Sequence, residues 1–265
     1  MSDESALQAA SAAGLIERIA ALLEPLGGRT AVAAQRFGPL PGRRLANAPV
    51  ASGQRPDAES GDAQADPVAR EAVEPSPASP ASVDLEVSIR ADEVFSAASL
   101  AKLPIAIELM RRADLGQFDL SERFDTASVP RVGGAGVLDV LDPSTRLTLA
   151  ELCTLMLIVS DNTAANFILD LMGMGEVNET LNRLHLPHTR LARHFMDTAA
   201  RASGRDNLTS ASDMLALLSL IRGNALPGGR RLRETLAAQQ SFGELTEGWL
   251  PAGATLAHKD GTLDD

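Results

Sequence analysis

The segment FSAASLAK (residues 95–102) lies immediately before an apolar run that begins at Leu103, and together they predict a buried helix. If this helix begins near Ala98 or Ser99, the hydroxyl of Ser99 and the amine of Lys102 lie on one face, about one turn apart. The unpaired N–H groups and positive dipole at a helix N-terminus stabilise negative charge on a serine or acyl oxygen. The spacing therefore favours a serine nucleophile. The alternative is that Ser99 only caps the helix and Lys102 is a solvated charge.

Lysine occupies only two positions in this sequence. Of 24 lysines and arginines together, only Lys102 and Lys259 are lysines. Arginine stays protonated near neutral pH, whereas lysine can become a neutral base or serve as a compact point charge. We therefore expect both lysines to have roles that arginine cannot fill.

Length and composition predict one domain, which could have two lobes. The chain has 265 residues, 45% of them hydrophobic, and can bury a substantial core. A net charge of −11 argues against a nucleic-acid or anionic-membrane partner. Residues 1–4 are acidic where a signal peptide is basic, and no apolar run has membrane-spanning length. We expect a cytoplasmic monomer with no nucleic-acid or membrane partner.

Cysteine and histidine give no indication of a metal centre or another cofactor. Cys153 is the only cysteine and lies in an apolar helical run, so we expect a buried thiol. His185, His188 and His194 have a spacing that resembles metal ligands, but Pro187 interrupts any helix they could share. We expect no metal and no cofactor.

The N-terminal third predicts a helix followed by an interrupted hairpin. Apolar residues at helical spacing over 6–26 predict a helix, and TAVAAQRF (30–37) and VDLEVSI (83–89) predict paired strands. Residues 39–82 hold eight of the fifteen prolines and no aromatic residue. Such a composition buries too little apolar surface to offset the entropy of ordering. We expect a disordered insertion at the hairpin tip.

The rest of the chain predicts mostly helices. Thr148 and Glu151 form a capping box at the start of one of them, and Ser210 and Asp213 form a second capping pair. The residues Ser160-Asp161-Asn162 fall at a tight junction between two predicted apolar helices. Because burial of polar side chains is costly, we expect these three residues to have a specific role. The expected elements are helices at about 98–113, 148–159, 163–171, 175–184, 210–222 and 229–240, and a strand at 255–258.

Three motifs follow one another along the chain: Ser99-x-x-Lys102, Ser160-Asp161-Asn162 and Lys259-Asp260-Gly261. Over residues 83–262 the sequence resembles the class A β-lactamases and penicillin-binding proteins, whose signature is S-x-x-K, S-D-N and K-T-G. The resemblance implies an α+β fold of the β-lactamase/transpeptidase type. An all-helical lobe at about 100–240 would pack against a partial antiparallel sheet that carries the Lys259 segment.

The resemblance also implies catalytic roles. Ser99 would be the acylated nucleophile, and Lys102 would take its proton if burial and nearby cations lower the pKa of Lys102. Ser160 would relay a proton to the leaving group, helped by the positive charge of Lys259. No cofactor is implied.

Substrate-binding roles follow from the same resemblance. Asn162 would bond the amide of the substrate's side chain, and Lys259 would attract a substrate carboxylate. The backbone N–H groups of Ser99 and Thr262 would form the oxyanion hole, with Gly261 beside them in the substrate-binding strand.

The sequence departs from the family pattern in three places. The segment RLARHFMD (190–197) lacks the glutamate that activates the deacylating water, and Asp197 is its nearest carboxylate. Asp260 replaces the usual Thr or Ser, which places a negative charge where a carboxylate would dock, and Thr262 is the nearest hydroxyl. The chain ends at Asp265, before two further strands and a terminal helix of the family domain. We therefore expect a truncated member with an incomplete sheet.

The function implied is a β-lactamase-like serine hydrolase that acts through a Ser99 acyl-enzyme, with a β-lactam, an ester or a D-alanyl peptide as its small-molecule substrate. Two alternatives remain open. The missing glutamate and Asp260 favour an esterase or a D,D-peptidase-like hydrolase. A penicillin-binding module that is acylated without turnover, or an inactive truncated chain, would also fit.

Overall fold

A computed structural model describes Glu17 and residues 19–21, 29–37, 83–240 and 255–263. Most of the predicted helix at 6–26, and the predicted disordered insertion at 39–82, lie outside the described residues. In chain order the main elements are β1 (Val32–Phe37), β2 (Val83–Ile89), β3 (Val94–Ser96), the 3₁₀ helix η2 (Ala98–Ala101), α3 (Lys102–Asp114), β4 (Arg123–Asp125), β5 (Arg146–Thr148), α4 (Leu149–Ile158), α5 (Asn162–Met172), α6 (Met174–Arg183), α7 (Thr198–Ala202), β6 (Leu208–Ser210), α8 (Ala211–Arg222) and α9 (Gly229–Ala237).

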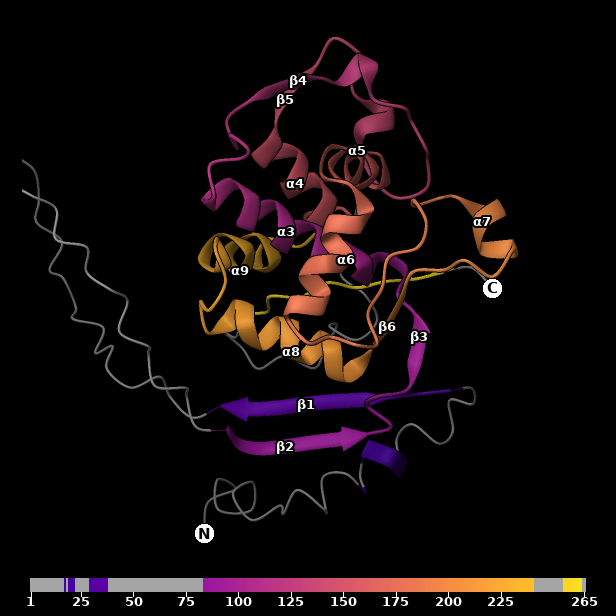
Figure 1. The fold of residues 1–265 in the computed structure, drawn as a ribbon, viewed down its shortest axis with the longest axis vertical. Helices are drawn as coiled ribbons and strands as arrows, with labels where there is room; N and C mark the ends of the chain where they lie inside the picture. The colour runs from indigo at the N-terminus through magenta and orange to yellow at the C-terminus, as the bar shows by residue number, and fades with distance from the viewer. Residues whose placement is uncertain (1–16, 18, 22–28, 38–82, 241–254, 264–265) are drawn as a thin grey trace, which may run out of the picture.

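Helix α3 is the centre of the helical body. It is buried from Lys102 to Met110 and packs against α4, α5, α6 and α9 (Figure 1). The sequence explains this position, because after its first residue apolar residues cover the helix over this span except at Glu108, whose buried carboxylate is bonded by Arg111 and Arg112. Among the other elements, α4 and α5 contribute the most residues to the core, and Cys153 in α4 is buried as expected. Burial raises the pKa of the Cys153 thiol to about 12, so this thiol stays protonated.

The helix starts match the capping signals. Thr148 and Glu151 form a complete capping box at α4, and the Ser210 hydroxyl accepts a hydrogen bond from the backbone N–H of Asp213 at α8. Asp161 caps α5 by accepting from the N–H of Ala164. These bonds satisfy N–H groups that a helix N-terminus leaves unpaired. They fix where α4 ends and α5 begins.

Within the described residues the strands form three separate antiparallel pairs, β1–β2, β3–β6 and β4–β5. The predicted hairpin is confirmed, with Val32 opposite Ile89 and Arg36 opposite Leu85. It lies against α8, at the opposite end of the molecule from β4–β5 (Figure 1). The short strands β3 to β6 were not expected. The fold is α+β, as the sequence predicted.

The prediction of a strand at Thr255–His258 is wrong. This segment is extended but forms no ladder with any described strand. Its His258 N–H donates instead to the carbonyl of Leu236 at the end of α9. The segment 255–263, which carries Lys259, is therefore an extended segment bonded to the end of α9 and is not a strand of a sheet. No helix in the described ranges combines the length and the apolar character that a membrane span requires.

Candidate active site

The Ser99 hydroxyl and the Lys102 amine are in direct contact. Ser99 lies in η2 and Lys102 begins α3, so the change from a 3₁₀ to an α-helical turn separates the two residues. The Nζ atom of Lys102 lies 2.9 Å from the Oγ atom of Ser99. Ala98, immediately before Ser99, has a φ of 45°, which a non-glycine residue adopts only at some cost. The local fold thus holds the serine at a strained turn beside its candidate base.

Lys102 is fully buried, which excludes the alternative of a solvated first-turn charge. Its Nζ atom has four oxygen neighbours, which are Oγ of Ser99, Oγ of Ser160 at 3.0 Å, the Ser160 carbonyl at 2.8 Å and Oδ1 of Asn162 at 2.7 Å. Burial, and then the positive charge of Lys259, lower the pKa of Lys102 from 10.5 to about 7. A large fraction of Lys102 is therefore neutral near pH 7 and has a lone pair that can accept the Ser99 proton.

Ser160 connects the two lysines. It lies between α4 and α5 with a φ of 55°, a strained value for serine that turns its side chain toward Ser99. Its hydroxyl is 2.8 Å from the Oγ atom of Ser99, and the Nζ atom of Lys259 donates to it at 3.2 Å. The Ser160 hydroxyl therefore lies in a chain of hydrogen-bonded groups that runs from Lys102 to Lys259.

The glycine-rich loop at 133–136 is bonded to the Ser160-Asp161-Asn162 motif. The Asp161 carboxylate accepts from the N–H groups of Val137 at 2.7 Å and Leu138 at 2.9 Å. The Asn162 side chain donates to the Gly133 carbonyl at 3.1 Å while its Oδ1 accepts from Lys102. Gly134 and Gly136 have φ values of 74° and 129°, which suit glycine. These bonds orient the side chain of Asn162 at the edge of the Ser99 cavity.

Lys259 is held by its own neighbour. Its Nζ atom lies 3.1 Å from Oδ1 of Asp260 and 2.8 Å from the Asp260 carbonyl, and its side chain is fully buried. Burial lowers the pKa of Lys259, while the Asp260 carboxylate opposes this shift. The Asp260 side chain is 37% exposed, so a charged carboxylate lies at the surface directly beside the Lys259 amine. The Asp260 carboxylate therefore offsets part of the positive charge of Lys259.

The 259–263 segment lies directly against the serine. A Cβ atom added to Gly261 would lie 3.1 Å from the Ser99 backbone nitrogen, so any larger residue would need the backbone around Ser99 to shift. Neither the Ser99 N–H nor the Thr262 N–H has an acceptor among the described residues. Both residues line a cavity of about 350 Å³, together with Asn162. Two N–H donors without a described acceptor, beside the candidate nucleophile Ser99, match the requirement for an oxyanion hole.

Phe195 faces Lys102 from the loop at 190–197. The Nζ atom of Lys102 lies 4.4 Å from the centre of the Phe195 ring, and Phe195 is almost completely buried. The sequence pointed to Asp197 as the functional residue of this loop, and Phe195 was not among the predicted site residues. The signal in the sequence was Asn166, a polar residue inside the apolar helix α5. In the structure its amide accepts from the N–H of Phe195 (2.8 Å) and donates to the Phe195 carbonyl (3.0 Å).

Asp197, the carboxylate selected from the sequence, lies outside the group of residues around Ser99. Its Oδ1 atom caps α7 by accepting from the N–H of Ala200 at 2.9 Å. It lines a neighbouring cavity and is not among the residues that line the Ser99 cavity. Seven of the eight residues selected from the sequence thus lie together around Ser99, and Asp197 lies at the neighbouring cavity.

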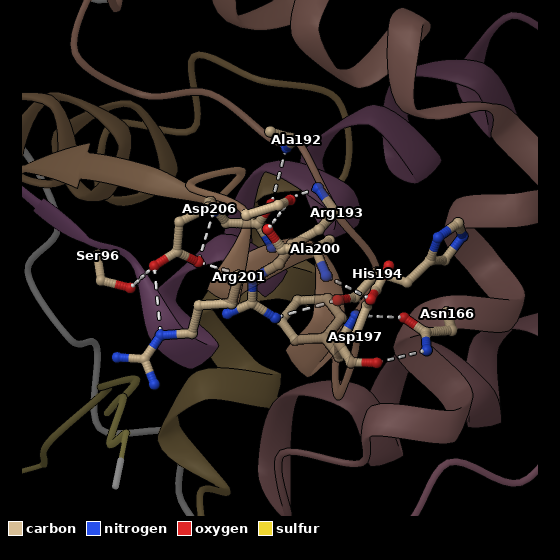
Figure 2. Close-up of polar contacts among 12 residues, drawn as sticks. Ser96, Asn166, Ala192, Arg193, His194, Asp197, Ala200, Arg201 and Asp206 are labelled. Atoms are coloured by element: carbon tan, nitrogen blue, oxygen red, sulfur yellow. Dashed lines mark hydrogen bonds and ion pairs between the residues drawn. The ribbon is translucent and has the colours of Figure 1, made fainter. Parts of the chain in front are cut away.

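Asn166 and Asp206 hold the 190–197 loop in place, as Figure 2 shows. Asn166 holds its centre, and Arg193 donates to Asp206 at 2.7 Å and to the carbonyl of His194 at 3.1 Å. Asp206 also accepts from Ser96, the last residue of β3, at 2.5 Å. These hydrogen bonds and the Arg193–Asp206 ion pair connect the loop to the strand that leads into Ser99. The position of Phe195 is therefore fixed by the fold.

The comparison with known families agrees with this geometry. Residues 81–265 match the model of the β-lactamase enzyme family. The chain belongs to the β-lactamase enzyme family. It is 30% identical over 187 residues to β-lactamase FAR-1 of Nocardia farcinica, which covers 66% of this chain and 57% of that protein. The chain thus spans less than two thirds of the length of the curated β-lactamases it matches.

Solved structures of the same family share the fold. A β-lactamase of Sphaerobacter thermophilus is 27% identical with a TM-score of 0.61, over 67% of this chain and 69% of that one. PBP-A is 31% identical with a TM-score of 0.60, over 67% of this chain and 66% of that one. A point mutant of PBP-A, at the same identity and TM-score, was solved as an acyl-enzyme complex with penicillin G.

Proposed function

We propose that this chain is a β-lactamase-like serine hydrolase that reacts with β-lactams and activated esters to form an acyl-enzyme on Ser99. The observation that carries the proposal is the 2.9 Å contact between Ser99 and the fully buried Lys102, whose pKa is lowered to about 7. A neutral amine within hydrogen-bond distance of a hydroxyl is the arrangement that general-base activation of a serine requires.

The acylation step uses the groups around Ser99. The Ser99 proton passes to the lone pair of Lys102 as Oγ bonds to the substrate's carbonyl carbon. The backbone N–H groups of Ser99 and Thr262 stabilise the oxyanion that forms. As the bond from the carbonyl carbon to the leaving nitrogen or oxygen breaks, Ser160 donates its proton to the leaving atom. Lys102 then returns a proton to Ser160, 3.0 Å away, and is neutral again.

Hydrolysis of the acyl-enzyme is proposed to be slow. The water that attacks the Ser99 ester must lose a proton to a base on the ester face, and such a base contributes about 10²–10⁴-fold to the rate. The residue of the 190–197 loop that faces Lys102 is Phe195, which carries no proton acceptor. Asp197 is proposed to be a capping residue and not this base, because its carboxylate is bonded at α7. A penicilloyl group on Ser99 should therefore persist.

Asp260 supports a second candidate function, an esterase that prefers neutral substrates. Its carboxylate lies 3.1 Å from the Lys259 amine and reduces the attraction of this amine for a β-lactam carboxylate. A neutral ester does not meet this repulsion. A small acyl group also leaves more space for water beside Phe195, which favours turnover of small esters over penicillins.

Burst kinetics test the proposed function. A chromogenic cephalosporin mixed with the protein in stopped flow should release a burst of product equal to the enzyme concentration, followed by a slow steady state. Small p-nitrophenyl esters should show a burst with faster steady turnover. The Ser99→Ala variant should give no burst with either substrate. Release without a burst, or a burst that survives in Ser99→Ala, would overturn the proposal.

A further inference from the structure

A second cavity, of about 440 Å³, adjoins the Ser99 cavity on the other side of the 190–197 loop. Phe195 and Met196 line both cavities and form the partition between them. The second cavity has apolar walls that include Val132 and Phe167, and three ionisable groups, Asp170, His194 and Asp197. Its volume falls in the range of small-molecule sites.

The partition has one fixed and one movable part. Phe195 is held by the two hydrogen bonds of its backbone to Asn166. The Met196 side chain is 46% exposed, and its sulfur lies against Gly134, where a Cβ atom would be only 2.8 Å from it. Methionine is unbranched and adopts several rotamers at low cost. A change of the Met196 rotamer would therefore join the two cavities above Gly134.

The charge of the second cavity is negative. Asp170 uses its Oδ1 atom to bond the Nε2 atom of His194 at 2.6 Å, and Asp197 uses its Oδ1 atom to cap α7. The Oδ2 atom of each carboxylate has no partner among the described residues. No lysine or arginine of the described chain lines this cavity. The two carboxylates and one imidazole thus favour a cation beside apolar walls.

We propose that the second cavity binds the distal end of the substrate's acyl group, and that this end is an apolar chain that terminates in an ammonium group. This inference rests on the proposed function, because the near end of the same acyl group is esterified to Ser99. The chain passes between Met196 and Gly134, its methylenes contact Val132 and Phe167, and its ammonium group faces Asp170. Met196 then determines which acyl lengths the site accepts.

Three p-nitrophenyl esters test this proposal: acetyl, hexanoyl and 6-aminohexanoyl. The acylation rate of each ester is read from p-nitrophenol release, and every rate is divided by the acetyl rate of the same variant. The wild-type chain should prefer 6-aminohexanoyl over hexanoyl by about threefold to fivefold at low salt, the size that an exposed ion pair allows. Asp170→Asn should reduce this ratio to about one, and Met196→Ala should raise the relative rates of both long esters.

Asp114→Asn is the matched control, because it removes the same charge at the exposed end of α3, away from both cavities. Its ester preference should equal that of the wild-type chain. Acetyl acylation of Ser99 together with a preference that Asp170→Asn leaves unchanged would overturn the second site alone. Absence of Ser99 acylation by all three esters would overturn the proposed function itself.

Discussion

The Nζ atom of Lys102 lies 4.4 Å from the centre of the Phe195 ring, and the backbone of Phe195 is held at that position by Asn166. An aromatic face attracts the charged form of the amine but cannot accept a proton from water. In the proposed reaction, this pair therefore bears differently on acylation and on deacylation. It is compatible with acylation of Ser99 and withholds a base from deacylation.

Replacement of Phe195 by glutamate should shorten the life of the acyl-enzyme. Phe195→Glu places a carboxylate next to Lys102, where it can activate water, and deacylation of penicilloyl-Ser99 should accelerate about 10²-fold. Phe195→Gln is the control, because it has a similar size and no basic carboxylate. The decay of the adduct is followed by mass spectrometry after excess penicillin is removed. Equal lifetimes in the two variants would contradict the role assigned to Phe195.

The rate of acylation should depend on the protonation of both lysines. Because neutral Lys102 is the active form and its pKa is about 7, kcat/KM for an ester should rise about tenfold per pH unit below pH 7 and level off above it. The rate should fall again at high pH, below 10.5, as Lys259 loses its proton. Lys102→Arg should abolish the reaction, because arginine stays protonated. A flat profile between pH 5 and pH 8 would exclude Lys102 as the base.

Two substitutions of Asp197 separate capping from catalysis. Asparagine also caps helices, so Asp197→Asn should change ester turnover by less than about tenfold. Asp197→Ala removes the bond to the N–H of Ala200 and should lower the free energy of unfolding by about 1 kcal/mol. Urea denaturation and steady-state kinetics measure the two effects. A loss of about 10²-fold in turnover in Asp197→Asn would instead make this carboxylate the base.

Asp260 should act on anionic substrates selectively. Asp260→Thr introduces the family residue and removes the carboxylate 3.1 Å from Lys259, so KM for benzylpenicillin should fall about tenfold. KM for a neutral ester should change little. Asp260→Asn should reproduce most of the effect if charge is the cause, and little of it if the threonine hydroxyl is required. A parallel change for both substrate classes would show that Asp260 does not select by charge.

Local features of the sequence predicted the parts of the site that local rules control. The spacing of Ser99 and Lys102, the capping box at Thr148 and the cap at Ser210 all depend on residues three positions apart, and all are confirmed. The helix α7 was missed, although Asp197 followed by Thr198 and two alanines is a start signal.

Features that depend on distant neighbours were harder to predict. The alternation at Thr255–His258 fits a strand, but a strand needs a partner, and His258 bonds the end of α9 instead. The strands β3 and β6 are three residues long, too short for their alternation to be recognised. The contact of Lys102 with Phe195 joins positions 93 residues apart, and only the tertiary fold brings them together.

Intact-protein mass spectrometry with benzylpenicillin tests the central claim most directly. The wild-type chain should gain the mass of one penicillin, peptide mapping should locate it on Ser99, and the adduct should outlast removal of the free drug. Ser99→Ala should show no mass gain, and Lys102→Met, which lacks the basic amine, should be labelled far more slowly. An adduct that forms equally in Ser99→Ala would contradict the claim that Ser99 is the nucleophile.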